Sequence, residues 1–291
     1  MTPDQLSAKI EGTIRRVSKS FGNQITATQE GLFEKIQILL TKLDLNPDGT
    51  IKQSQANRAL LAKANVSFEK AFQESGYYQY LNTLPDEIRI ITEANTAYFA
   101  FLKDQITVDA QYIKNLQTQT VGQLESLLAN EGLEAQVKKP ILDIMSQNIN
   151  TGASYSDLVK QLRGFVIGDE KYAGKLQSYA GQIVSDTLFN YSRAIQEAIS
   201  TKVGLQFVVY SGGIMDDSRE FCVERAGNYY HKDEVSAWAN LDWQGKRRGT
   251  TESTIFIYAG GYRCLHQIIY VSELVVPDEV VRRAKTKGIY T

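Results

Sequence analysis

Hydrophobic positions in the first part of the chain recur at spacings of four, four and three residues. These positions are Leu6, Ile10, Ile14, Val17, Phe21, Ile25, Thr28, Leu32, Ile36, Leu39 and Leu43. An eleven-residue period, about 3.67 residues per turn, keeps a hydrophobic stripe nearly straight along one side of a helix. The pattern predicts a helix over residues 4–43, about 60 Å long at about 1.5 Å per residue. Either the stripe packs on other helices of this chain, or the helix associates with other copies or with another protein.

Helical periodicity continues to about residue 204 in stretches separated by turn residues. The predicted helices are 54–76, 85–116, 120–130, 134–148, 154–164 and 176–202. Residues Asp44 to Gln55 begin like a calcium-binding loop, but Gln55 stands where the bidentate Glu is needed, and Lys52 occupies the ninth position. We therefore expect no calcium there and interpret this segment as an Asx/Gly turn between two helices.

The pattern changes at Leu205 to short runs rich in β-branched and aromatic residues. The runs 205–210, 254–258 and 267–271 are predicted strands. Asp217 and Glu220 predict a capping box for one short helix. A second short helix is predicted at 233–240 and a last helix after Pro277. The sequence thus predicts an α+β fold: an elongated helical domain at 1–204, a small mixed module with short antiparallel strands at 205–276, and a C-terminal helix or tail at 277–291.

Charge and composition limit the kinds of partner and the compartment that are expected. The chain has 32 basic and 33 acidic residues, so a basic face for specific nucleic-acid binding is not expected. We interpret the basic clusters at 246–248 and 282–287 as solvated surface. No signal peptide or apolar run of about 18 residues is evident, so we expect a soluble protein that is not secreted. Two cysteines do not form a disulfide framework, which favours a reducing compartment.

The reactive side chains gather in residues 207–271. Both cysteines and both histidines of the chain lie there: Cys222, His231, Cys264 and His266. Two Cys and two His could bind zinc tetrahedrally, although neither half has the tight spacing of a zinc finger. The alternatives are a Cys222–Cys264 disulfide, or a structural cluster of buried thiols and hydrogen-bonded histidines. We favour the structural cluster and therefore expect no cofactor.

The same residues could form a catalytic triad with a cysteine nucleophile, a histidine base and an aspartate that orients the base. The candidate members are Cys222 or Cys264, His231 or His266, and Asp216 or Asp217. No nucleophile elbow, papain-like signature or phosphate-binding glycine loop surrounds them. We therefore expect the protein not to be an enzyme.

Several short motifs follow one another in the same region. They are Tyr191-Ser-Arg193, Gly204-Leu-Gln-Phe207, Tyr210-Ser-Gly-Gly213, Asp217-Ser-Arg219-Glu-Phe-Cys222-Val-Glu-Arg225, Trp243-Gln-Gly245 and Gly260-Gly-Tyr-Arg-Cys264-Leu-His266. In their order and spacing, residues 185–271 resemble the C-terminal region of phage head morphogenesis proteins, the Mu F-like minor head proteins. Members of that family often end the module with His-Pro-x-Cys-Arg-Cys, whereas this chain has Gly-Gly-Tyr-Arg-Cys-Leu-His.

The resemblance implies a structural protein of the virion, made in the bacterial cytoplasm and located in the capsid interior or at the portal vertex. It would dock on portal or capsid proteins during head assembly, and could aid DNA packaging or ejection. The family has no established catalytic residues that could be carried over. The long N-terminal helix and the Tyr77–Tyr80 patch would supply contact surface, including self-association through the helix. The alternatives are a Cys/His or metal-dependent hydrolase, an injected effector, or a host-side helical scaffold with a zinc-binding tail.

Overall fold

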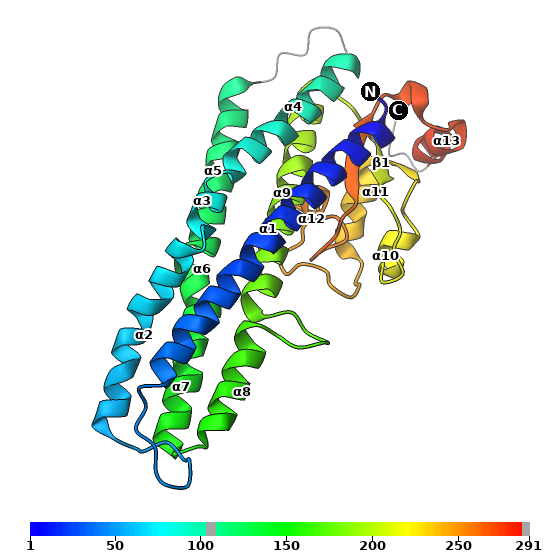
Figure 1. Cartoon of the computed structure of the whole chain (residues 1–291). Coiled ribbons are helices and arrows are strands. Elements are labelled where there is room, and N and C mark those ends of the chain that lie inside the picture. Colours follow the sequence, from blue (N-terminus) through cyan, green and yellow to red (C-terminus); the bar gives the residue numbers. More distant parts are fainter. Residues whose placement is uncertain (103–108, 287–291) are drawn as a thin grey trace. The chain divides into compact units, whose positions relative to one another are not determined.

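The computed structural model describes residues 1–102 and 109–286 and confirms the predicted α+β fold (Figure 1). The helices before residue 204 are α1 (Pro3–Leu40), α2 (Gln55–Glu74), α3 (Tyr77–Leu81), α4 (Leu84–Leu102), α5 (Ala110–Leu128), α6 (Glu131–Leu133), a π-helical segment (Glu134–Lys138), α7 (Lys139–Thr151), α8 (Tyr155–Val166) and α9 (Lys175–Val203). After them come β1 (Phe207–Ser211), α10 (Glu220–Val223), β2 (Tyr229–His231), α11 (Lys232–Ala237), a 3-10 helix (Trp238–Asn240), α12 (Ile255–Tyr258), β3 (Gln267–Val271), a 3-10 helix (Glu273–Val275) and α13 (Asp278–Thr286).

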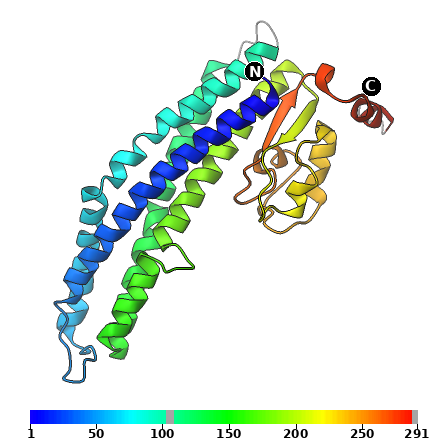
Figure 2. The same ribbon diagram turned by 45° about the vertical axis from the view of Figure 1, so that its right-hand side comes forward.

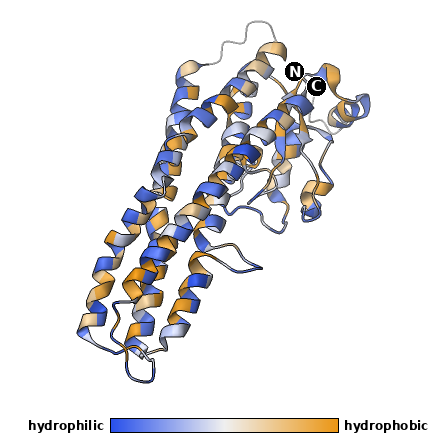
Figure 3. Cartoon of the chain, in the orientation of Figure 1, coloured by the Kyte–Doolittle hydropathy of each residue, from blue (hydrophilic) through white to orange (hydrophobic). Residues whose placement is uncertain are grey.

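Helix α1 confirms the prediction from the eleven-residue pattern. Every position of the stripe, from Leu6 to Leu43, is buried. Figure 3 shows hydrophobic residues alternating with hydrophilic ones along this and the other long helices. The chain itself therefore covers the stripe, as expected for a helix that packs on its own chain.

The chain divides into two compact units, and helices α1, α4, α5 and α9 have residues in both. The described parts of Met1–Val17, Pro85–Thr120 and Ser185–Thr291 form the first unit, and Ser18–Leu84 with Val121–Val184 form the second. The predicted boundaries at 204 and 276 stay a prediction. The candidate site lies in the first unit.

One residue of the Tyr77–Tyr80 patch, Tyr77, has a different place from the one predicted. Tyr77 is fully buried in the second unit, where its hydroxyl donates a 2.9 Å hydrogen bond to the carbonyl of Leu128. Its ring packs edge-on against Phe72, and the neighbouring Tyr80 stacks on Phe21. Tyr77 therefore belongs to the core, because its aromatic neighbours cover it, and is not a contact surface for a partner.

The segment between α1 and α2 is the predicted Asx turn. The backbone N–H and the hydroxyl of Thr50 both donate to the Asp48 carboxylate, at 3.0 and 2.7 Å. Ser54 then caps α2 by accepting a hydrogen bond from the N–H of Asn57. The side chain of Asp48 is thus used within the turn.

The predicted helix 85–116 differs from the structure. Helix α4 ends at Leu102, and α5 begins at Ala110 and continues to Leu128 through the predicted break near residue 117. Residues 103–108 of that prediction, and Lys287 of the basic cluster, lie outside the described residues.

The sheet has the strand order β2-β1-β3, and both pairings are antiparallel. The first and last predicted strands are confirmed as β1 and β3, whereas β2 is a three-residue strand that was not predicted. The predicted strand 254–258 is wrong, because residues 255–258 form helix α12. Thr251 and Thr254 exchange side-chain to backbone hydrogen bonds at its start, which stabilises the first turn.

The short helix after β1 also differs from the prediction. Helix α10 begins at Glu220 with Arg219 at its N-cap, and no side chain caps it. The predicted capping box between Asp217 and Glu220 is therefore wrong. The neighbouring Ser218 uses its hydroxyl to accept a hydrogen bond from the N–H of Met215 instead.

Side chains from two helices form hydrogen bonds with backbone groups at the outer edge of β3. The N–H of Tyr270 donates to the side-chain oxygen of Gln196 on α9, and its carbonyl accepts a 2.7 Å hydrogen bond from the hydroxyl of Tyr98 on α4. Gln196 is held in turn by Asn95, at 2.7 Å. Figure 2 shows β1 and β3 beside the C-terminal half of α9. Since unpaired edges bind other chains, these contacts protect the sheet and tie it to α4 and α9.

Candidate functional site

Three of the four predicted metal ligands come together in the first unit. Cys222 lies on α10, Cys264 on the loop after α12, and His266 directly before β3. One ligand atom from each lies within 4.8 Å of the others, and Cys264 Sγ is 3.8 Å from His266 Nδ1. The three residues are only 2%, 3% and 4% exposed, respectively. The sequence therefore identified a true spatial cluster.

His231, the fourth predicted ligand, does not belong to this cluster. It pairs with Phe207 at the start of β1, whereas His266 contacts Gly212, just beyond the other end of that strand. Five residues of strand correspond to about 16 Å at about 3.3 Å per residue. His231 instead forms the N-cap of α11, where its Nδ1 accepts a hydrogen bond from the N–H of Asp233 at 3.3 Å.

Tyr210 brings a hydroxyl between the two sulfurs. Its oxygen lies 3.3 Å from Cys222 Sγ and 3.4 Å from Cys264 Sγ, and its ring stacks on His266 with centroids 5.0 Å apart. Tyr210 is the last but one residue of β1, and its side chain is fully buried. Strand β1 thus places an oxygen donor beside two sulfurs and an imidazole.

Because Gly260 has no side chain, the two sulfurs can occupy the space beside its backbone. A Cβ at this position would lie 2.4 Å from Cys222 Sγ and 3.0 Å from Cys264 Sγ. Its backbone N–H donates to Cys264 Sγ at 3.3 Å. Any larger residue would displace the sulfurs, so the cluster requires glycine here for its lack of a side chain.

Arg193 on α9 fixes the loop that carries Cys264 and His266. Its guanidinium is 1% exposed and donates to the carbonyls of Cys264, His266 and Ile257 at 2.6 to 2.9 Å. These acceptors are neutral, and Asn190 supplies a further neutral oxygen at 3.2 Å. A buried positive charge beside the cluster therefore favours a negative charge on its sulfurs.

The two thiols differ in acidity. The hydrogen bond between them lowers the pKa of Cys264 and raises the pKa of Cys222, and the Arg193 charge lowers the pKa of Cys264 further. Burial raises the pKa of Tyr210 well above its ordinary value, so its hydroxyl stays protonated and can donate. Of the two thiols, Cys264 is therefore the more acidic.

Further motif residues brace the surrounding loops. Asp186 accepts the N–H of Arg263 at 2.8 Å and forms a 2.9 Å ion pair with Arg247. Arg219 donates to the carbonyl of Tyr262 at 2.5 Å, and the indole of Trp243 donates to the carbonyl of Gly260 at 2.9 Å. The residues that carry the resemblance are thus largely used to hold one another in place.

The structure does not bring the candidate triad residues together. Asp216 and Asp217 are exposed on the loop before α10, and neither carboxylate belongs to the buried group of Cys222, Cys264 and His266. Among residues 1–102 and 109–286, the buried group thus contains two sulfurs and an imidazole but no carboxylate.

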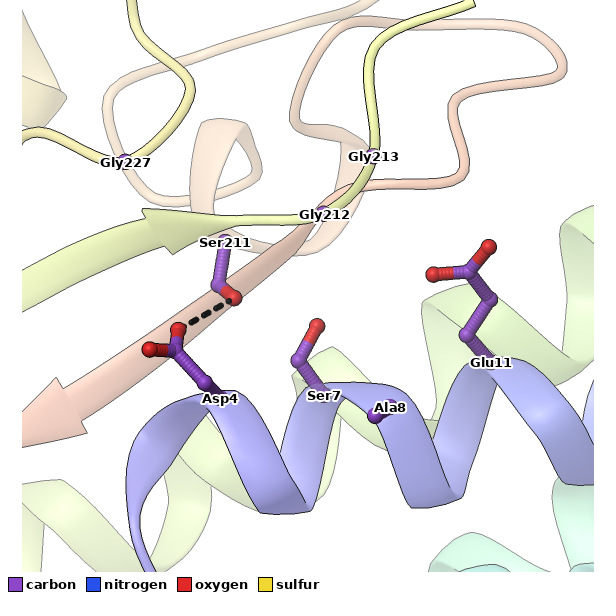
Figure 4. A pocket seen from close by; sticks show the side chains of 8 residues that line it. All are labelled: Asp4, Ser7, Ala8, Glu11, Ser211, Gly212, Gly213 and Gly227. Atoms are coloured by element: carbon purple, nitrogen blue, oxygen red, sulfur yellow. Dashed lines mark hydrogen bonds between the residues drawn. The ribbon is translucent and has the colours of Figure 1, made fainter.

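A separate open pocket of about 250 Å³ lies in the same unit (Figure 4). Asp4, Ser7 and Glu11 of α1 line one side, and Ser211 with the Gly212–Gly213 turn lines the other. The Ser211 hydroxyl donates to the Asp4 carboxylate at 3.4 Å. The pocket is polar, and neither sulfur nor imidazole lines it. No local pattern indicates this pocket, because its two sides are about 200 residues apart in the chain.

Three residues at the cluster were not singled out as site residues from the sequence: Arg193, Tyr210 and Gly260. Arg193 could have been recognised, because it is a charged residue between the apolar Tyr191 and Ile195 on a helix that is buried on this side. Tyr210 and Gly260 carry no comparable signal, since their roles depend on loops that meet only in the folded chain.

Comparisons of the chain with protein-family models, curated proteins and solved structures found no match. In residues 1–102 and 109–286, no helix is both long enough and apolar enough to cross a membrane.

Proposed function

We propose that this protein is a structural, non-enzymatic minor head protein of a phage, which docks on the portal or on capsid proteins during head assembly. The proposal rests on the ordered motifs of residues 185–271 and on their resemblance to Mu F-like minor head proteins. Such a protein would reside in the virion, in the capsid interior or at the portal vertex, and could aid DNA packaging or ejection.

The observation that carries the proposal is the use of the motif residues within the fold. Arg193, Arg219 and Trp243 all donate to backbone carbonyls of the loop between α12 and β3. Side chains used in this way hold the loop in a fixed shape. A docking module needs such a shape, whereas a hydrolase needs an accessible nucleophile.

Exposed apolar side chains after β3 offer a contact surface. Leu274 and Val275 are neighbours in the 3-10 helix Glu273–Val275, and they are 95% and 54% exposed. Apolar anchors of this kind supply much of the binding energy when a partner covers them. In the proposed function, the portal or capsid partner buries these two side chains.

The first test is the composition of the particle. Particles purified from a culture of the phage that encodes this chain are analysed by mass spectrometry, and the protein is expected to sediment with the heads after nuclease and high-salt washing. A particle of normal composition that lacks the protein would overturn the proposal.

The second test is binding to the portal protein of the same phage. The full chain is used, because α4 and α9 complete the edge of β3 and an isolated 205–276 fragment would lose those contacts. The chain and the portal ring are expected to sediment together, whereas binding to neither the portal nor the capsid proteins would contradict docking.

A further inference from the structure

We propose that Cys222, Cys264 and His266 bind one structural zinc ion, with the hydroxyl oxygen of Tyr210 as the fourth ligand. The inference is independent of the proposed function, because it rests on the geometry of the buried cluster alone. It also differs from the set predicted from the sequence, in which His231 was the fourth member.

Three distances within the cluster are close to the edges of a tetrahedral zinc site. With Zn–S of about 2.3 Å and Zn–N or Zn–O of about 2.0–2.1 Å, tetrahedral angles give S–N and S–O edges of about 3.5 Å. The structure has a Cys264 Sγ to His266 Nδ1 distance of 3.8 Å. Tyr210 Oη lies 3.3 and 3.4 Å from the two sulfurs, where the fourth corner of such a tetrahedron would be.

The surroundings also suit a bound ion. Gly260 leaves open the space over both sulfurs that a side chain would fill, and its N–H points at Cys264 Sγ. Arg193 holds the carbonyls of Cys264 and His266, so two ligands on one loop are fixed before an ion binds. Backbone N–H groups and fixed neighbours of this kind orient ligands in metal sites.

The ligand types select the metal. Two thiolates and an imidazole favour zinc over calcium or magnesium, which prefer oxygen ligands. When zinc binds, both thiols lose their protons, so the two thiolates balance the charge of the ion and two protons go to solvent. Because all four side chains are buried, the site is closed and therefore structural rather than catalytic.

The experiment measures zinc in the full chain, purified without a histidine tag under reducing conditions and dialysed against zinc-free buffer. About one zinc per chain is expected, with release by a thiol-modifying reagent. A protein that takes up no zinc after reconstitution and keeps two free thiols would overturn the proposal. A Cys222–Cys264 disulfide that is present despite reducing conditions during purification would overturn the proposal as well.

Variants distinguish this ligand set from the one predicted from the sequence. Cys264→Ser and His266→Ala are expected to lose zinc, whereas His231→Asn is expected to keep it in full. Tyr210→Phe keeps three ligands and is expected to weaken zinc binding about 10-fold or more, since even the loss of a group that only orients a ligand has an effect of that size. Zinc retained by Cys264→Ser, or zinc lost in a folded His231→Asn protein, would contradict the assignment. Unchanged affinity in Tyr210→Phe would remove Tyr210 from the ligand set.

A measurement on the unsubstituted protein covers the case in which the cysteine variants fail to fold. Cobalt(II) is added in place of zinc, and the spectrum is expected to show thiolate-to-cobalt charge-transfer absorption and the intense visible bands of a four-coordinate ion. A cobalt-loaded protein without the thiolate band would show that the cysteines are not ligands.

Discussion

Arg193 links helix α9 to the loop that carries two of the cluster residues. Replacement by Met keeps the apolar part of the side chain but leaves the carbonyls of Cys264, His266 and Ile257 without their donor. Each unpaired buried polar group costs about 1–3 kcal/mol, so we expect Arg193→Met to lower the free energy of unfolding by about 3 kcal/mol or more. Urea denaturation followed by tryptophan fluorescence measures this loss.

Both tryptophans lie in the C-terminal part of the chain, so their fluorescence reports on the region that Arg193 supports. Arg89→Met in α4 is the matched control, because the Arg89 side chain is 57% exposed and pairs with the exposed carboxylates of Asp86 and Glu93. Its effect is expected within about 0.5 kcal/mol. Equal losses in the two variants would show that the buried hydrogen bonds of Arg193 contribute little.

His231 makes stability depend on pH. Burial lowers its pKa from the ordinary value of 6.5, and this outweighs the opposite effect of the Asp233 carboxylate, 3.6 Å from Nδ1. The unfolded chain therefore binds a proton at a higher pH than the folded chain does. The stabilising contribution of neutral His231 is complete above pH 6.5 and decreases as the pH falls below that value.

Thermal unfolding between pH 8 and pH 5 tests this with His231→Asn as the comparison, because Asn also caps helices well but does not titrate. On acidification, the melting temperature of the original protein is expected to fall further than that of the variant. Other acidic groups affect both proteins alike and cancel in the difference. Parallel pH profiles would mean that the pKa of His231 is the same in the folded and unfolded chains.

The sequence analysis grouped His231 with the cysteines, whereas the structure separates them. The difference shows what sequence patterns cannot determine. Cys264 and His266 do lie together, as expected, but in the loop before β3 and not within a strand, so their closeness follows from the single residue between them and not from strand alternation. Which histidine then joins Cys222 depends on strand pairing, because β2 places His231 opposite Phe207 while β3 places Gln267 opposite Ser211. These partners lie at opposite ends of β1, and no local pattern in the sequence specifies that register.

Helix α1 shows the opposite case, in which the pattern determines the element. Its stripe repeats over eleven positions, so a single misplaced residue would not hide the period. The segment 254–258 is short, and there β-propensity was overridden by the threonine hydrogen bonds that start α12. Long periodic helices were therefore predictable, whereas among the short elements the strands β1 and β3 were predicted and the three-residue β2 and the four-residue α12 were not.

Two glycines in helical segments give predictions of opposite sign for the same substitution. A Cβ at Gly22 in α1 would meet nothing within 4 Å, so Gly22→Ala is expected to raise the free energy of unfolding by up to about 1 kcal/mol. A Cβ at Gly132 would lie 2.3 Å from both the Leu127 carbonyl and the Tyr179 hydroxyl. Overpacking of this kind is expected to destabilise Gly132→Ala by about 1–3 kcal/mol.

Urea denaturation followed by circular dichroism at a helix-sensitive wavelength measures both variants. Both residues lie in the second unit, so each serves as the control for the other. If both substitutions stabilised the protein, helix propensity alone would account for them, and the close approach at Gly132 would have no energetic effect.

Contacts between distant parts of the chain set the limit of the sequence-based prediction. The carbonyl of Tyr270 is 172 residues from Tyr98, which donates to it, and the backbone N–H of Tyr270 depends on Gln196. The sequence separated the sheet region from the helices by composition, which is a local property. It could not reveal that buried polar residues of α4 and α9 complete the edge of the sheet, because polar residues in helices usually face solvent.

In the proposed function, a few exposed apolar side chains provide much of the binding energy when the chain docks in a phage head. Leu274 is 95% exposed, so Leu274→Asp is expected to change the free energy of unfolding by less than about 0.5 kcal/mol. Loss of a buried apolar anchor typically costs an interface about 1–2 kcal/mol or more, and introducing a carboxylate adds desolvation. We therefore expect binding to the portal or capsid partner to weaken about 10-fold or more.

Val66→Asp is the matched control, because Val66 is 72% exposed on α2, in the second unit. Quantitative co-sedimentation with the portal ring compares the two variants with the original chain. Reduced binding for Leu274→Asp alone would assign the contact to the segment after β3. Equal loss in both variants would indicate non-specific hydrophobic association, and unchanged binding in both would place the contact elsewhere on the chain and leave the role of the Leu274–Val275 segment without support.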